Sequence, residues 1–179
     1  MSLHDRLVAL LREKSVKHGT FTLASGSTSD FYVDARQTTL HGEGSWLVAR
    51  LLLERLRDDV VGVGGLTLGA DPIACATAAV AHTEGRALHA FLIRKQAKGH
   101  GTGRFVEGLA NLPEGSPVAV VEDTTTTGGS LLTAIERARD AGLRVVQALT
   151  VVERQEGAVE RLAEAGLDLQ ALVTRAELE

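Results

Sequence analysis

The chain has 179 residues, of which 44% are hydrophobic, 23% are charged and only 3% are aromatic. This length is typical of one domain, and the composition excludes a disordered chain. The formal net charge of −4 excludes recruitment of nucleic acid or of an anionic membrane by bulk electrostatics, so any anionic ligand must be held by a local cluster of basic groups.

The first 57 residues predict two helices that flank a hairpin. Leucines at helical spacing predict an amphipathic helix over residues 2–16. Phe21, Leu23 and the run 31–33 predict short strands on either side of a turn at 25–27. A second helix is predicted over 44–57, with three side chains directed inward: Trp46, Leu53 and Leu56.

From residue 60 onward, short apolar runs alternate with helical patterns. Strands are predicted at 60–63, 90–93, 118–121, 145–152 and 169–173, and helices from residue 71 and over 130–141 and 157–165. Asp71 is predicted to be an N-cap with Pro72 as the first helical residue, and Gly142 to take the left-handed conformation that ends a helix.

This alternation predicts an α/β fold with a central, mainly parallel sheet flanked by helices. We expect one domain over 1–179, in which residues 1–40 form the N-terminal helix and a small hood over the sheet and 60–175 form the α/β core. Ligands of such sheets bind beyond the carboxyl ends of the strands. The segments that follow predicted strand ends are 64–69, 94–108 and 122–129, and we expect the chemistry there.

Cys75 is the only cysteine, which excludes an intrachain disulfide and a multi-cysteine metal site. It lies in the apolar run 73–76 and is predicted to be packed in the core. No apolar run approaches the roughly 20 residues of a membrane span, and the N-terminus has no signal-peptide core. We therefore expect a cytoplasmic protein.

The segment with the most specific pattern is a strand that runs into two acids, four threonines and two glycines before a helix begins. Backbone N–H groups at a helix N-terminus bind anions, and glycines allow close approach. Adjacent carboxylates suit sugar hydroxyls better than a bare phosphate, so the pattern indicates a sugar phosphate. A capped turn with surplus threonines is the alternative. The residues are Glu122, Asp123, Thr124, Thr125, Thr126, Thr127, Gly128, Gly129 and Ser130.

This segment resembles the phosphoribosyl-pyrophosphate (PRPP) signature of the type I phosphoribosyltransferases. The resemblance implies that Glu122 and Asp123 face the ribose 2′- and 3′-hydroxyls. It also implies that the threonine–glycine loop, residues 124–130, cradles the 5′-phosphate. The signature leaves open which base is used.

The segment 94–104 holds four fixed positive charges, one histidine and three glycines. A solvated basic loop would have this composition, but a lid that stabilises a departing diphosphate and excludes water would have it too. The segment resembles the catalytic loop of the orotate phosphoribosyltransferases, as does Glu107 followed by Gly108. That resemblance implies a homodimer with shared active sites and diphosphate contacts from four residues: Arg94, Lys95, Lys98 and His100. Lys95, Lys98, His100 and Asp123 are the expected catalytic residues.

Residues 21–26 and 29–34 resemble the N-terminal hood of the same family, in which the pair matching Phe31 and Tyr32 lies near orotate. Such a pair is otherwise a core feature. Arg154 follows the fourth predicted strand and is either a surface residue or, by the resemblance, an orotate contact together with Thr126. A planar guanidinium suits the anionic edge of orotate through paired hydrogen bonds.

Two positions depart from the family pattern. Many members carry a lysine where this chain has Ala24, and a Tyr-Lys pair where it has Thr67 and Leu68. Two lysine contacts to PRPP are therefore missing, although the backbone amides of residues 64–69 can still bind anionic oxygen.

The resemblance implies transfer of ribosyl 5-phosphate from PRPP to orotate, with Mg²⁺ carried by the diphosphate and no dedicated protein ligands for it. Two alternatives stay open. One is a phosphoribosyltransferase for a purine or uracil, and the other is a non-catalytic PRPP sensor. Turnover assays with each base would distinguish the first alternative from orotate transfer. A sensor could function without the basic residues at 94–100, so their presence argues against the second alternative.

Overall fold

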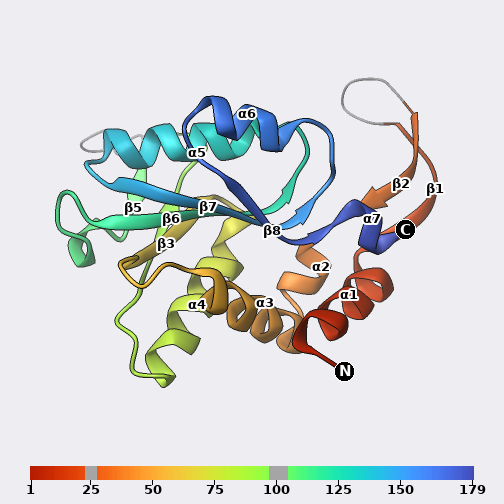
Figure 1. Cartoon of the computed structure of the whole chain (residues 1–179), viewed down its shortest axis with the longest axis horizontal. Coiled ribbons are helices and arrows are strands. Elements are labelled where there is room, and N and C mark those ends of the chain that lie inside the picture. The colour runs from red at the N-terminus through yellow and green to blue at the C-terminus, as the bar shows by residue number, and fades with distance from the viewer. Residues whose placement is uncertain (23–27, 97–104) are drawn as a thin grey trace.

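The computed structural model describes residues 1–22, 28–96 and 105–179. Its centre is a six-stranded sheet with the order β5-β4-β3-β6-β7-β8 (Figure 1). The strands are β3 (Gly62–Leu66), β4 (His89–Ile93), β5 (Val106–Glu107), β6 (Pro117–Thr125), β7 (Arg144–Glu153) and β8 (Leu169–Thr174). Every neighbouring pair is parallel except β4 and β5. The predicted α/β class with a mainly parallel sheet is confirmed.

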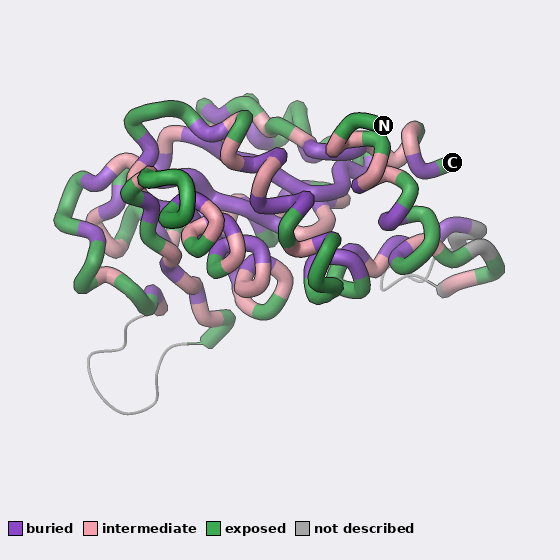
Figure 2. The backbone as a smooth tube through the Cα atoms, turned by 90° about the horizontal axis from the view of Figure 1, so that it is seen from below, coloured by how far each residue is buried: buried purple, intermediate pink, exposed green. Residues whose placement is uncertain are grey.

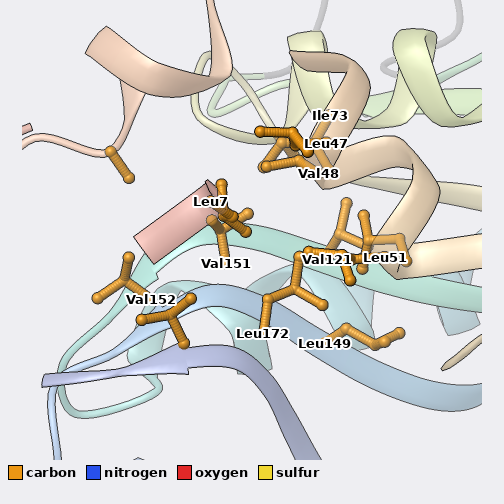
Figure 3. Packing of buried hydrophobic residues seen from close by; sticks show 14 of the residues in the cluster. Leu7, Leu47, Val48, Leu51, Ile73, Val121, Leu149, Val151, Val152 and Leu172 are labelled. Carbon is orange, nitrogen blue, oxygen red and sulfur yellow. The ribbon is translucent and has the colours of Figure 1, made fainter. Parts of the chain in front are cut away.

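Helices cover both faces of the sheet. One face packs against α1 (Leu3–Lys14), α3 (Gly42–Arg55) and α4 (Ala70–Thr83), as Figure 3 shows for Leu7, Leu47, Ile73 and their neighbours. The opposite face packs against α5 (Gly129–Asp140) and α6 (Ala158–Glu164). Because both faces are covered, β3 is buried at every position and β6 and β7 at most positions, which explains their continuous apolar runs (Figure 2).

The N-terminal helix and hairpin form as predicted, outside the six-stranded sheet. Ser2 caps α1 through a capping box with Asp5. β1 (Val16–Thr22) and β2 (Thr28–Val33) make a separate antiparallel sheet, and the predicted turn between them lies outside the described residues. The chain ends beside α1, where the short helix α7 (Arg175–Leu178) is held by Arg12, whose Nη2 donates to the Glu177 carbonyl at 2.7 Å.

Gly142 takes a φ of +86° directly after Ala141, the C-cap of α5, which confirms the predicted helix end. Among the described residues, no helix has both the length and the apolar character required to span a bilayer.

Several strand and helix boundaries differ from the prediction. β3 begins at Gly62 and continues through Gly64 and Gly65, which were expected in a loop. A side chain at either glycine would collide with a neighbouring backbone carbonyl, so these glycines let β4 and β6 pack closely against β3. β6 continues to Thr125, which places the acidic pair in the strand itself.

Short elements also formed where none was expected. These are β5 at the end of the basic segment, α2 (Arg36–Thr39), the 3₁₀ turn Leu109–Asn111 and α7. Each has four residues or fewer, too few for a hydrophobic period to be detectable.

Three side-chain predictions were wrong. Cys75 is exposed. The buried residues of α4 recur three and four positions apart along one face of the helix, and Cys75 does not lie on that face. Trp46 is 42% exposed and lies near the Arg6 guanidinium, because α3 buries its opposite face. Asp71 is the second residue of α4 rather than its N-cap, a position that Gly69 takes. Leu56 is buried as predicted, whereas Leu53 is only partly buried.

Candidate active site

Two adjoining cavities lie beyond the carboxyl ends of the central strands. The first has a volume of about 420 Å³. It is lined by residues 32–34, Arg36, residues 66–69, Lys95, residues 122–124 and Ser130. The second has about 270 Å³ and is lined by Glu122 and residues 124–131. The sheet therefore brings together three predicted segments: the loop after β3, the start of the basic segment and the loop after β6.

The acidic pair lies where the two cavities meet. Glu122 is only 7% exposed, whereas Asp123 is half-buried and lines the first cavity. Burial, followed by the charge of Asp123 and a side-chain hydrogen bond with it, raises the pKa of Glu122 to about 8. At neutral pH Glu122 is therefore mostly protonated, which weakens the repulsion between the acidic pair and an anionic ligand.

Because the pKa of Glu122 is raised from 4.5 to about 8 on folding, the stability linked to its proton is fully present below about pH 4.5. It is lost as the pH rises through 8. Glu122→Gln is neutral at every pH, so we expect its Tm to match wild type near pH 4.5 and to exceed it by several degrees near pH 9. Each pKa unit corresponds to at most about 1.4 kcal/mol. Thermal melts across this range measure the difference, with Glu136→Gln on the exposed face of α5 as the control. A Tm difference that does not change with pH would contradict the assignment.

The threonine–glycine loop has the backbone of an anion site. Gly128 has a φ of +78° and directly precedes α5, whose first N–H groups face the loop. The hydroxyls of Thr124 and Thr125 are buried and have no hydrogen-bond partner within the described part of the chain. Such hydroxyls are costly to bury unless a ligand or water completes them. Arg161 of α6 steadies the loop by donating to the Thr127 carbonyl at 3.3 Å.

The basic segment is only partly described. Lys95 is exposed and lines the first cavity. The Arg94 side chain instead pairs with Glu107 of β5, Nη1 to Oε1 at 3.2 Å, and lines neither cavity. Lys98 and His100 lie outside the described residues, as does Ala24 of the hood.

The residues predicted to contact a base lie at the same edge. Tyr32 lines the first cavity, whereas Phe31 is 2% exposed in the core, with the Arg175 guanidinium 5.1 Å from its ring centre. Arg154 directly follows β7 and its backbone N–H donates to the Thr125 carbonyl at 2.9 Å, which places it beside Thr126.

Arg154 is a buried cation with unused hydrogen-bonding capacity. It is 7% exposed, and its Nη2 pairs with Glu156 Oε1 at 2.9 Å. Its Nε has no partner within residues 1–22, 28–96 and 105–179. A buried guanidinium with an unpaired donor suits a planar oxyanion.

Two cavity residues had not been singled out from the sequence. Asp34 follows β2, and its Oδ1 pairs with Arg36 Nε at 2.8 Å. Both side chains line the first cavity. The available signal was an acid and a base two residues apart directly after a predicted strand. Leu68 is 71% exposed on the rim of the cavity, at the position where many relatives were expected to carry lysine.

Known proteins resemble this chain over nearly its whole length, although a comparison with models of protein families gave no match. The orotate phosphoribosyltransferase of Streptomyces avermitilis is 51% identical over 163 residues, 89% of this chain and 87% of that protein. The Nostoc enzyme of the same name is 43% identical over 178 residues, 99% of this chain and 86% of that protein.

The solved structures agree. The orotate phosphoribosyltransferase of Mycobacterium tuberculosis in complex with PRPP superposes with a TM-score of 0.83 and 41% identity, over 99% of both chains. Identity of this extent over this coverage, together with the cavity geometry, shows that the chain belongs to the orotate phosphoribosyltransferase family and has the type I phosphoribosyltransferase fold.

Proposed function

We propose that this protein is a pentosyltransferase that transfers the ribosyl 5-phosphate group of PRPP to orotate. The products are orotidine 5′-phosphate and pyrophosphate, in the de novo synthesis of UMP. The observation that carries the proposal is the position of the acidic pair, which lies where the second cavity, lined by the threonine–glycine loop, meets the first cavity, lined by Lys95.

The ribose and its phosphate are assigned to the end of β6. Asp123 and Glu122 accept or share hydrogen bonds with the 2′- and 3′-hydroxyls, and the threonine–glycine loop holds the 5′-phosphate through backbone N–H groups and hydroxyls. The buried hydroxyls of Thr124 and Thr125, which find no hydrogen-bond partner among the described residues, support this assignment. Gly129 and Ser130 begin α5, whose N-terminal amides favour negative charge.

The reaction breaks the bond between C1′ and the diphosphate oxygen, and the leaving group takes the electron pair. Positive charge then develops on the ribose, where the Asp123 carboxylate stabilises it, while Lys95 and the other cations of the basic segment stabilise the diphosphate. A nitrogen of orotate forms the new bond to C1′, and its proton passes to the departing diphosphate. No protein nucleophile is required.

Orotate is assigned to the edge formed by Arg154 and Thr126, next to the aromatic residues of β2. The Nε of the buried Arg154 guanidinium has no partner in the part of the chain that the structure describes, and the carboxylate of orotate would complete its hydrogen bonds. Phe31 lies in the core and Tyr32 at the cavity, so we assign Tyr32 the direct contact with the base and Phe31 the support behind it.

Mg²⁺ is proposed to enter with PRPP. The described residues bring together no group of three or more His, Cys, Asp or Glu side chains that could hold a metal, so diphosphate oxygens and water would be its ligands. The ion would offset the charge of the diphosphate.

An assay of orotate consumption tests the function. Purified protein, PRPP and orotate are expected to give orotidine 5′-phosphate only when Mg²⁺ is present. Adenine, hypoxanthine and uracil serve as alternative acceptors. Turnover of one of these bases without turnover of orotate would overturn the proposed substrate, and binding of PRPP without turnover of any base would favour a sensor.

We also propose a homodimer in which the basic segment of one subunit completes the site of the other. Lys98→Ala is expected to lower kcat at least about tenfold, because about 1.4 kcal/mol of transition-state stabilisation is lost. Steady-state assays at saturating PRPP measure this effect, and unchanged turnover would remove the segment from the mechanism.

Mixing two impaired variants tests whether the site is shared. In a heterodimer of Lys98→Ala and Asp123→Asn, one site would combine an intact Asp123 with an intact Lys98 from the partner. Activity is therefore expected to return after subunit exchange. If both residues act within one subunit, mixing will restore nothing. Light scattering reports the oligomeric state in the same samples.

A further inference from the structure

Arg36 is held at the first cavity by an anchor that leaves part of its guanidinium available. Its Nε donates to Asp34 Oδ1 at 2.8 Å, and the Arg36 backbone N–H contacts the same oxygen at 3.3 Å. The Gln37 side chain donates to the other oxygen, Oδ2, at 3.2 Å. The carboxylate of Asp34 therefore fixes the direction of the arginine from its Nε side.

Among the side-chain hydrogen bonds of residues 1–22, 28–96 and 105–179, Arg36 donates through its Nε and neither Nη atom takes part. Arg36 lines the first cavity together with the acidic pair, and the Asp123 charge contributes, after Asp34, to raising the pKa of Arg36. The Nη side of the Arg36 guanidinium therefore lies within electrostatic range of the proposed ribose site.

The charged side chains that line the first cavity nearly balance one another. The described lining residues include two cations, Arg36 and Lys95, and three acids, Asp34, Glu122 and Asp123. Because burial raises the pKa of Glu122 to about 8, this residue is mostly protonated at neutral pH and the charges that line the cavity nearly cancel. Leu68 on the same rim offers no charge. A diphosphate that enters this cavity therefore depends strongly on each of the two cations.

We propose that Arg36 is a binding residue for the diphosphate group of PRPP, contacting it through its Nη donors. The inference rests on the proposed function, which supplies the substrate. The other anionic groups are accounted for elsewhere, since the 5′-phosphate is assigned to the second cavity, which Arg36 does not line. The carboxylate of orotate is assigned to Arg154, which lines neither cavity.

The test compares Arg36→Ala and Arg36→Lys with a matched control. Arg57→Ala removes another exposed arginine whose Nε donates to an aspartate two residues away, Asp59, at 2.9 Å, but which lines neither cavity. Calorimetry with pyrophosphate and Mg²⁺ measures anion binding, and steady-state kinetics give the KM for each substrate.

Arg36→Ala is expected to weaken pyrophosphate binding and to raise the KM for PRPP about tenfold each, while the KM for orotate stays within about twofold of wild type. Arg36→Lys keeps the charge but loses the fork, so about a threefold change is expected. Arg57→Ala should change none of these values. Unchanged pyrophosphate affinity in Arg36→Ala, or a rise confined to the KM for orotate, would overturn the inference.

This design separates the inference from the proposed function. Wild-type protein that fails to consume orotate, yet binds pyrophosphate more tightly than Arg36→Ala does, would sink the function and leave the Arg36 site standing. If the wild-type protein consumes orotate but Arg36→Ala behaves like Arg57→Ala, the proposed function stands and the inference about Arg36 is overturned.

Discussion

Asp123→Asn is expected to lower kcat about a hundredfold, which corresponds to about 2.7 kcal/mol of transition-state stabilisation. The amide can still hydrogen-bond a ribose hydroxyl but carries no charge to stabilise the cationic sugar. Because Asp123 is half-buried and lines the cavity, solvent does not fully screen that charge. The KM for PRPP should change much less than kcat, because the charge matters most in the transition state.

A second variant disturbs the same carboxylate without replacing it. A methyl group on Gly69 would collide with Asp123 Oδ1 and lie 2.8 Å from Asp123 Cγ. Gly69 has an ordinary helical φ of −59°, so Gly69→Ala introduces no backbone strain and the carboxylate must move instead. We expect a loss of kcat with little change in Tm.

Gly42→Ala is the matched control, since its added methyl group would meet nothing within 4 Å at the start of α3. Steady-state kinetics and thermal melts of the three variants distinguish a positional requirement from a loss of fold. Full activity in both Asp123→Asn and Gly69→Ala would remove Asp123 from catalysis.

The sequence predicted the sheet well because its strands are buried on both faces. A continuous apolar run such as 118–121 can be recognised as a buried strand from its own sequence alone. The helices between the strands have a clear hydrophobic period. Boundaries failed where polar residues continue a strand. β6 extends through Thr125 because its backbone pairs with β7 as far as Glu153, and the pairing of two distant segments is not visible in either one alone.

The candidate site was predictable where one segment holds the whole motif. The loop at 124–130 and the start of the basic segment both lie at the cavities. Arg36 was missed because it is far from the acidic pair in the sequence, and only the fold brings both to the same cavity. Cys75 was misplaced because an apolar neighbourhood in sequence does not fix which face of a helix packs.

Arg154→Ala is expected to lower kcat/KM for orotate about a hundredfold and to leave the affinity for pyrophosphate nearly unchanged. A charged pair removed from water contributes roughly 2–5 kcal/mol when one partner is truncated. Arg154 is 7% exposed and its Nε lacks a partner among the described residues, so the carboxylate of orotate would meet an already desolvated donor.

Arg154→Ala also leaves Glu156 without its ion-pair partner, so the effect of losing this ion pair on kcat/KM must be measured separately. Glu156→Gln keeps the shape of the side chain but removes its charge from the Arg154 pair, whose Nη2–Oε1 distance is 2.9 Å. Because the Glu156 side chain is 32% exposed, water can replace the lost partner, and we expect kcat/KM for orotate to stay within about threefold of wild type.

Arg154→Lys discriminates charge from geometry. Lysine restores the positive charge but presents no planar fork, so it should recover only part of the lost kcat/KM. The measurements are kcat/KM with orotate varied at saturating PRPP, together with Tm values to verify folding. Equal losses for orotate and PRPP would show that the Arg154 side chain supports the site as a whole rather than recognising the base.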